Sequence, residues 1–368
     1  MTFSGILVDD NEDESVYAEL MSSKGLLNLV YQRPRAVSQH AKEIFNEHPD
    51  IVVLDFRLDL DLGDLAPNEA YKGSALAQQL RDLAIENPEG DFPIVLISSE
   101  EQIREQYEPD RTSHDLFDFL YSKEHINAER KKVQSQIISL SEGYQTLKQK
   151  NGEFSVTNLA GIGEDEGEIA IDYQGLKNPI SRAAAPHLVA SVFFNQLINR
   201  SGPLIDINNA CARLGLARSE ASRVSDFLQG SDIGYNGLFS TGWVRFWAHR
   251  LDALAREMFG ARPTGLEAGH RSEAFSKAVG EKFEPAASPW TKKTDELISF
   301  ACTCCNDGTE LRHSVGVFES SLPSFSVQRR VCWRCVHEDR DQHQTPSIIL
   351  DSSDEALIAE VKKMEIPG

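Results

Sequence analysis

Short apolar runs alternate with amphipathic stretches along the first third of the chain. Five runs have the length and composition of buried strands: GILVDD, a stretch near Leu29–Tyr31, IVVLDF, FPIVLISS and DFLYSK. Helical patterns separate them at 15–22, 36–47, 73–85 and 100–108. Buried strands that alternate with helices are typical of a parallel sheet with helices on both faces. We therefore predict an α/β domain over residues 1–128, with a doubly wound five-stranded parallel sheet.

A further helical pattern follows, from Ile126 to Lys150. Its apolar positions recur at heptad-like gaps: Ile126, Val133, Ile137, Leu140, Tyr144 and Leu147. Such a stripe either packs on its own domain or forms a coil with a second copy of the chain. We favour the first because Arg130 interrupts the stripe. Residues 129–150 are predicted to be a linker helix, and a homodimer stays an open alternative.

The remainder of the chain has a different organisation. Residues 151–295 carry mainly helical patterns and are predicted to form a mostly helical output or interaction domain. The acidic, turn-rich stretch 164–179 within it is expected to be a linker or a surface hairpin. A cysteine-rich module follows over 296–345. Residues 346–368 contain a short amphipathic tail helix behind a Ser or Asp cap.

The charge of the chain narrows the choice of partners. There are 37 basic and 57 acidic residues, and the formal net charge is −20. This charge repels the phosphates of nucleic acids and anionic membrane surfaces. No apolar run is long enough to cross a bilayer, and the N-terminus lacks the features of a signal peptide. We therefore expect a cytoplasmic protein without a membrane or nucleic-acid partner.

Polar side chains stand at the ends of four of the predicted strands. They are Asp9 and Asp10 after the first strand, Asp55 after the third, Ser98 after the fourth and Lys123 after the fifth. An open α/β sheet places its reactive groups at these ends, beside the point where the strand order reverses. Three carboxylates in one crevice repel one another unless a divalent cation lies among them, and Mg²⁺ suits an all-oxygen site. One carboxylate can then attack phosphorus, while the ion and the lysine neutralise the developing charge.

The motifs ILVDDNEDE, IVVLDFRLD, PIVLISSE and YSKEH together resemble the receiver domain of bacterial two-component response regulators, which has a flavodoxin-like fold. The resemblance covers the first third of the chain. It implies that Asp55 is the phosphoacceptor, Ser98 the switch hydroxyl and Lys123 the lysine that contacts the phosphoryl group. It also implies a cognate histidine kinase as donor, and a chain that accepts phosphate without being a turnover enzyme. The implied Mg²⁺ ligands are Asp9, Asp10, Asp55 and the backbone carbonyl of Arg57.

Three departures from that family lie close to the site. The usual short turn after the phosphoacceptor is replaced by the acidic loop RLDLDLGDLAPNEAYKG, which ends at Gly73 and is expected to cap the site or contact a partner. Glu124 follows Lys123 in place of a proline, which puts the usual cis-peptide turn in doubt. The aromatic switch position falls on Leu120, so coupling between Ser98 and an aromatic side chain is expected to be altered.

Five of the six cysteines lie in one C-terminal segment. The pairs Cys302-x-x-Cys305 and Cys332-x-x-Cys335 have the spacing of two knuckles that share one tetrahedral ion. We predict Zn²⁺ held by these four thiolates. The role is structural, because a closed coordination shell leaves no position for catalysis. Alternative ligands that the spacing leaves open are Cys304, His313 and His337.

These motifs favour a response regulator that accepts a phosphoryl group from a histidine kinase on Asp55 and signals through contacts with an unidentified downstream protein. Two alternatives stay open. A receiver joined to a helical and zinc-binding region is similar to response regulators of Detocs-type bacterial phage-defence systems, which implies a sink for phosphoryl groups from a kinase. A helix-turn-helix over 207–228 would instead imply a DNA-binding regulator, with Arg213, Arg218 and Arg223 as phosphate contacts.

Overall fold

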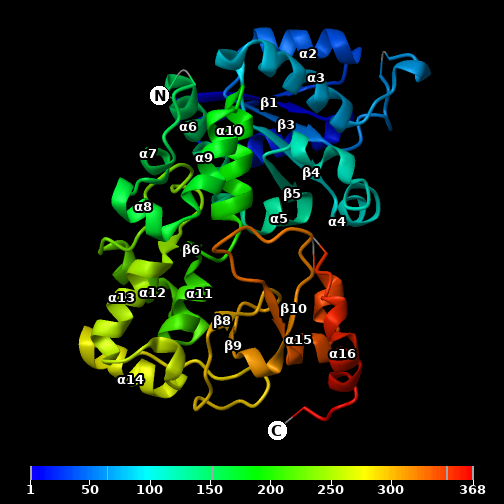
Figure 1. The fold of residues 1–368 in the computed structure, drawn as a ribbon. Coiled ribbons are helices and arrows are strands. Elements are labelled where there is room, and N and C mark those ends of the chain that lie inside the picture. Colours follow the sequence, from blue (N-terminus) through cyan, green and yellow to red (C-terminus); the bar gives the residue numbers. More distant parts are fainter. Residues whose placement is uncertain (1, 64, 151, 345–346, 367–368) are drawn as a thin grey trace. The chain divides into compact units, whose positions relative to one another are not determined.

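The computed structural model describes residues 2–63, 65–150, 152–344 and 347–366. It divides into two compact units, each formed by segments that are distant in the sequence (Figure 1). Unit 1 contains Met1–Gly163, Tyr173–Phe194 and Asn236–Trp243, and unit 2 contains Glu164–Asp172, Asn195–Tyr235 and Val244–Gly368. The borders of these two units do not coincide with the predicted domain boundaries near 128, 150, 295 and 345. Those boundaries stay predictions about which parts of the chain fold independently.

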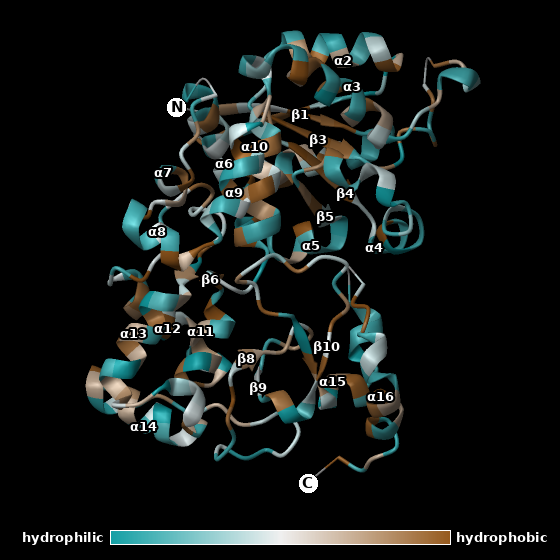
Figure 2. Cartoon of the chain, in the orientation of Figure 1, coloured by the Kyte–Doolittle hydropathy of each residue, from teal (hydrophilic) through white to brown (hydrophobic). Residues whose placement is uncertain are grey.

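Unit 1 is built on a five-stranded, all-parallel sheet. Its strands are β1 (Phe3–Val8), β2 (Leu27–Gln32), β3 (Ile51–Asp55), β4 (Ile94–Ser98) and β5 (Phe119–Ser122), in the order β2-β1-β3-β4-β5. Every residue of β3 and β4 is buried, which explains why these strands are continuous apolar runs rather than alternating ones. Figure 2 shows the strands of the sheet in the brown of apolar residues. The strand order and the flanking helices confirm the predicted flavodoxin-like sheet.

The helices around the sheet are α1 (Val16–Met21), α2 (Val37–Asn46), α3 (Gly73–Glu86), α4 (Glu100–Gln102), α5 (Lys123–Ala128) and α6 (Arg130–Gln149). Helix α2 packs against α3, and α1 packs against α5 and α6. The prediction of one helix from Ile126 to Lys150 is wrong at one point, because Glu129 leaves the helical conformation with φ −125° and ψ 39°. Helix α6 buries its apolar stripe within unit 1, as predicted.

The remaining helices of unit 1 are α7 (Val156–Ala160), α9 (Tyr173–Ser181) and α10 (Pro186–Phe193). The stretch 164–179 was predicted to be a linker or hairpin, and this is wrong, because α8 (Glu164–Ala170) and α9 cover most of it. Three acidic residues lie in the first turn of α8, where the helix dipole favours negative charge. Leu176 and Ile180 of α9 are buried. Acidic composition therefore does not identify a loop here.

A buried ion-pair network joins several elements of unit 1. Arg81 of α3 is 5% exposed and pairs with Asp91 at 3.2 Å and with Asp118 at 2.7 Å. Asp118 also accepts a hydrogen bond from the hydroxyl of Tyr144 on α6 at 2.5 Å. Asp91 lies 2.9 Å from Nδ1 of His187 on α10. Through these contacts, the network links α6 and α10 to the residues that lead into β4 and β5.

Replacing Arg81 by methionine is expected to lower the free energy of unfolding by about 3–5 kcal/mol, because two buried carboxylates lose their cation. Urea unfolding followed by circular dichroism measures the change. The control is Arg35→Met, which removes an exposed pair with Glu43 and should cost about 1 kcal/mol or less. Equal effects of the two substitutions would contradict the role of the network.

Unit 2 combines helices with short antiparallel sheets. Its helices are α8, α11 (Ile207–Leu214), α12 (Ala221–Gln229), α13 (Ala248–Phe259), α14 (Ala268–Val279), α15 (Trp333–His337) and α16 (Glu355–Val361). The paired strands are β6 (Leu204–Ile205) with β7 (Phe246–Trp247), β8 (Phe300–Ala301) with β9 (Gly308–Thr309), and β10 (Ser314–Gly316) with β11 (Arg330–Cys332). The core lies among α11 to α14, where Leu214, Val224, Leu251 and Phe275 are fully buried. This arrangement confirms a mostly helical region ahead of the cysteine module.

No helix in the described part of the chain combines the length and the apolar character that crossing a bilayer requires.

Candidate functional site

The carboxyl ends of the parallel strands bring the predicted polar residues to one edge of the sheet. The residues at this edge are Asp9 directly after β1, Asp55 and Ser98 as the last residues of β3 and β4, and Lys123 directly after β5. The strand registers align these ends, because neighbouring strands stay paired to within one residue of their ends. The edge lies where the strand order reverses, between β1 and β3. We refer to this group as the carboxylate site.

Lys123 joins two buried carboxylates of this site. Its ammonium lies 3.0 Å from Oδ1 of Asp55, 3.2 Å from Oδ2 of Asp9 and 3.4 Å from Oε2 of Glu14. Asp9 is 1% exposed and Asp55 is 4% exposed. Burial raises the pKa of Asp55 to about 7 and also raises the pKa of Asp9, although Lys123 acts in the opposite direction. The single positive charge of Lys123 therefore offsets only part of the unfavourable effect of burying two carboxylate charges.

Asp10 anchors the long loop that follows Asp55. Oδ2 of Asp10 accepts hydrogen bonds from the backbone N–H groups of Leu60 at 2.6 Å and Asp61 at 2.8 Å. Arg33 adds a second connection, because it donates to the backbone carbonyl of Asp10 at 3.1 Å and pairs with Asp61 at 2.6 Å. The sequence did not indicate this role, because the orientation of the Asp10 side chain depends on contacts with a loop that is distant in the sequence.

Two glutamines that the sequence analysis did not single out also contact the site. The hydroxyl of Ser98 donates to Oε1 of Gln102 on α4 at 2.6 Å. The guanidinium of Arg57 donates to Oε1 of Gln106 at 3.1 Å, while its backbone N–H donates to Oδ2 of Asp55 at 2.7 Å. A glutamine four residues after Ser98, on a helical pattern, is the signal that could have identified Gln102. The hydroxyl of Ser98 must give up this acceptor before it can donate its hydrogen bond to another one.

Two backbone features shape the site. Gly73 begins α3 so close to β3 that a Cβ atom would lie 2.2 Å from the carbonyl oxygen of Asp55, so a larger residue would displace this strand end. Lys123 begins α5, and the hydroxyl of Ser122 caps this helix by accepting the N–H of His125 at 2.9 Å. The receiver family usually has a turn with a proline at this position, whereas a capped helix begins here.

The donor set of the carboxylate site fits a hard divalent cation. Asp9, Asp10 and Asp55 provide buried carboxylates that are opposed here by the ammonium of Lys123. Oxygen ligands with an excess of negative charge suit Mg²⁺. Among the described residues, however, these aspartates do not converge as tightly as the cysteines described below, because Asp10 bonds to the loop and Lys123 contacts the other two. The carbonyl of Arg57 stays a predicted ligand.

The affinity for Mg²⁺ is expected to rise with pH around neutrality. The pKa of Asp55 is raised to about 7, so the carboxyl is protonated below that pH and must lose a proton to bind a cation. Affinity should change by up to about tenfold per pH unit below neutrality and level off above it. Titration calorimetry with MgCl₂ at several pH values measures this, and Asp55→Asn should weaken the dependence. An affinity independent of pH would contradict the prediction.

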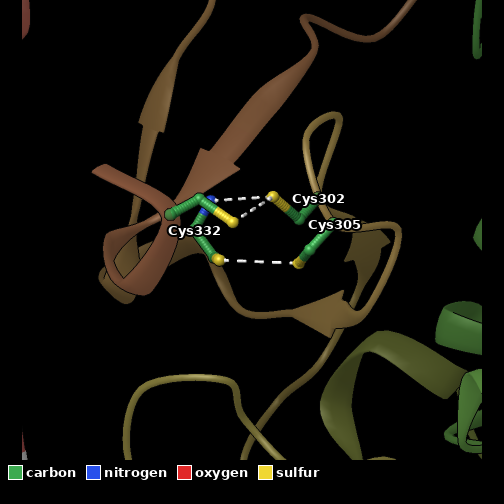
Figure 3. A group of neighbouring side chains, drawn as sticks. Cys302, Cys305 and Cys332 are labelled. Carbon is green, nitrogen blue, oxygen red and sulfur yellow. Dashed lines mark hydrogen bonds between the residues drawn. The ribbon is translucent and has the colours of Figure 1, made fainter. Parts of the chain in front are cut away.

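A second candidate site is the cysteine cluster of unit 2 (Figure 3). The Sγ atoms of Cys302 and Cys335 are 3.9 Å apart, as are those of Cys305 and Cys332. A tetrahedral Zn²⁺ ion with bonds of about 2.3 Å to sulfur places its ligand atoms about 3.8 Å apart. The four predicted cysteines are thus brought together at separations that suit one zinc ion.

Short strands explain how the two cysteine pairs meet. Cys302 directly follows β8 and Cys332 ends β11, so each pair begins at a strand end. Cys305 lies in the turn between β8 and β9, and Cys335 lies on α15. The backbone N–H of Cys332 donates to Sγ of Cys302 at 3.2 Å, which joins the two knuckles directly. This arrangement is compatible with a small ribbon-like zinc module.

The alternative zinc ligands lie outside this group. Among the described residues, the sulfur of Cys304 is not part of the group of four sulfur atoms that lie within 4.8 Å of one another. Nε2 of His337 contacts the backbone carbonyl of Met364 at 2.9 Å, and His313 contacts the carboxylate of Glu310. These contacts favour coordination by the four cysteines.

No protein-family model matches this chain, and no curated protein is significantly similar to it. The signal receiver domain of a modulated diguanylate cyclase from Desulfovibrio desulfuricans G20 is similar at 14% identity and a TM-score of 0.28, covering 39% of this chain and 98% of that domain. NtrX from Brucella abortus is similar at 17% identity and a TM-score of 0.28, covering 43% of this chain and 32% of that protein. Similarity at this level carries no argument, so the fold assignment rests on strand order and register.

Proposed function

We propose that the chain is a response regulator that accepts a phosphoryl group on Asp55 from a histidine kinase and signals through protein contacts. The observation that carries the proposal is the pairing of buried Asp55 with Lys123 at 3.0 Å, at the edge where the strand order reverses. A carboxylate that can act as a nucleophile, beside an ammonium group that can neutralise phosphoryl oxygens, supports phosphoryl transfer at this site. The chain then acts as a phosphoacceptor and not as a turnover enzyme.

In the proposed transfer, a carboxylate oxygen of Asp55 bonds to phosphorus as the bond from phosphorus to the donor imidazole nitrogen breaks. The nitrogen keeps the electron pair of the broken bond and takes up a proton. Lys123 neutralises part of the charge on the phosphoryl oxygens. Asp9, Asp10, Asp55 and the carbonyl of Arg57 would hold Mg²⁺, which would supply the remaining neutralisation of charge when bound.

The turns after β4 are the proposed place where phosphorylation is sensed. The hydroxyl of Ser98 leaves Gln102 to bind a phosphoryl oxygen, which releases one contact between the site and α4. Arg57, two residues after the phosphoacceptor, contacts the same segment through Gln106. A phosphoryl group on Asp55 can therefore change both contacts, and the surface of 100–107 is proposed to alter its binding to a downstream protein.

A protein partner is favoured over DNA because the three arginines of the alternative helix-turn-helix already have partners. Arg213 pairs with Asp252 at 3.2 Å. Arg223 pairs with Glu281 at 2.7 Å. Arg218 donates to the backbone carbonyl of residue 305 at 2.7 Å. Guanidinium groups must exchange such partners to contact phosphates, in a chain whose net charge of −20 opposes the approach of DNA.

Transfer from purified histidine kinases tests the proposal. A kinase autophosphorylated with radiolabelled ATP is mixed with the full chain and Mg²⁺, and the label is followed by gel electrophoresis. We expect label to move from a cognate kinase to the chain, and chelation of Mg²⁺ to prevent the transfer. Label that stays on every histidine kinase encoded by the same genome would contradict the proposed role.

A further inference from the structure

A cavity of about 200 Å³ in unit 2 is lined by an unusual concentration of positive charge. Its walls include four arginines, Arg200, Arg245, Arg329 and Arg330. The lining also includes the carboxylate of Asp206 and Cys302, one of the four cysteines of the predicted zinc site. The whole chain carries a net charge of −20, so the four guanidinium groups around this cavity form a local positive charge within an acidic protein.

Internal contacts fix three of these guanidinium groups in place. Glu319, whose side chain is 3% exposed, pairs with Arg200 and lies 3.2 Å from Nε of Arg329. One buried carboxylate therefore serves two arginines, which leaves an excess of positive charge. Arg330 donates to Oγ of Ser314 at 2.8 Å and to its backbone carbonyl at 2.9 Å, both neutral acceptors. These groups are positioned in advance, so binding an anion requires little ordering.

Arg245 is a second arginine of the cavity whose hydrogen bonds go to neutral acceptors. Its Nε donates to the carbonyl of Ile198 at 2.8 Å and its Nη1 to the carbonyl of Val244 at 3.0 Å. Neither acceptor is charged. Burial lowers the pKa of Arg245, while the charge of Asp206 acts in the opposite direction. The cavity therefore holds a partly buried cation whose hydrogen bonds go to backbone oxygens.

We propose that this cavity binds the phosphate group of a small phosphorylated molecule such as a mononucleotide. Planar guanidinium groups match phosphate oxygens in pairs, and several of them around one point are typical of phosphate recognition. A volume of about 200 Å³ lies below the usual range for drug-sized ligands of about 300–1,000 Å³, so it accommodates the phosphate and leaves part of the ligand at the mouth. Asn199 and Asn306 are also among the lining residues, and their side-chain amides can act as neutral donors. The proposal does not depend on phosphorylation of Asp55.

Titration calorimetry on the full chain tests this site with three probes: AMP, inorganic phosphate and adenosine. We expect AMP to bind, inorganic phosphate to compete with it, and adenosine not to bind. Adenosine binding as tightly as AMP would overturn the proposal, as would the absence of binding by both phosphate probes. A 5′-phosphorylated oligonucleotide that binds far more tightly than AMP at the same arginines would overturn the assignment to a small molecule.

Two variants place the binding in this cavity. Arg245→Gln removes the guanidinium, and Asn199→Asp adds a negative charge at an exposed wall position without changing side-chain size. Each should weaken AMP binding by about tenfold or more. Arg245→Gln removes hydrogen bonds to two backbone carbonyls and could destabilise unit 2. Asn199→Asp removes none of these bonds, so it tests the site independently of that effect. The matched control is Arg213→Gln, which removes an arginine paired with Asp252 outside the cavity and should leave AMP binding unchanged. Equal affinities in all three variants would place any binding elsewhere.

Discussion

Asp55→Asn is expected to abolish phosphoryl uptake while leaving the fold intact. The amide lacks the anionic oxygen that bonds to phosphorus, and it has nearly the same size in a site where Asp55 is 4% exposed. Loss of a nucleophile should lower the rate by about a thousandfold or more. The rate is measured as incorporation of label from a small phosphodonor such as acetyl phosphate, in the presence of Mg²⁺.

The matched control for this substitution is Asp13→Asn. Asp13 is an exposed acid in the short 3-10 helix Glu12–Ser15 that follows β1, close in sequence to the carboxylate site. This variant should label at the wild-type rate, because an exposed charge there is well solvated. The fold of both variants is checked by urea unfolding, and Asp55→Asn should be at least as stable as the wild type, since burial opposes the charge of Asp55. If Asp55→Asn were labelled at the wild-type rate, the phosphoacceptor would be another residue.

Cys335→Ser is expected to release the zinc ion and unfold the cysteine module. Cys335 is 1% exposed, and its Sγ lies 3.9 Å from that of Cys302. The apolar core around the cysteines is small, and its fully buried valines are Val315, Val331, Val336 and Val361. Structural zinc in such modules contributes about 10 kcal/mol or more to folding, so its loss outweighs the remaining packing. Zinc content by elemental analysis and thermal unfolding of the full chain measure the effect.

Cys304→Ser provides the control within the same segment. Cys304 lies beside a ligand in the sequence but outside the group whose sulfurs converge. This variant should keep the wild-type zinc content and thermal stability. Retention of zinc by Cys335→Ser together with its loss from Cys304→Ser would show that the ligand set differs from the one assigned here. A chelator should unfold the module in the wild type and in Cys304→Ser alike.

The parallel sheet could be predicted because its inner strands are buried on both faces. Such strands must be apolar at every position, and IVVLD and IVLIS stand out from the amphipathic stretches around them. The polar residue that ends each strand then marks the functional edge. For the same reason, Asp55 and Lys123 could be placed together although they are far apart in the sequence.

The direction in which a side chain points could not be predicted in the same way. Asp10 follows Asp9 directly, and the sequence treats them as an acidic pair. In the structure Asp9 contacts Lys123, whereas Asp10 accepts the N–H groups of Leu60 and Asp61. The difference depends on a loop about fifty residues later, whose path no local pattern specifies.

Contacts between distant irregular segments were also outside the reach of sequence patterns. The arginines of the cavity in unit 2 come from segments near 200, 245 and 330, which are linked by no periodicity or motif. Arg81 lies on α3, whereas its partners Asp91 and Asp118 lie in the separate segments that lead into β4 and β5. The cysteine pairs are the exception, because the geometry of a shared metal ion imposes a spacing that remains visible in the sequence.

The central claim is that this chain itself accepts a phosphoryl group at the carboxylate site. Intact mass spectrometry of the purified chain, after incubation with a small phosphodonor with and without Mg²⁺, tests it most directly. We predict one phosphoryl adduct per chain that requires Mg²⁺, is absent from Asp55→Asn and is lost on mild base treatment, as an acyl phosphate should be. The absence of any adduct with every donor, or an adduct that persists in Asp55→Asn, would contradict the account.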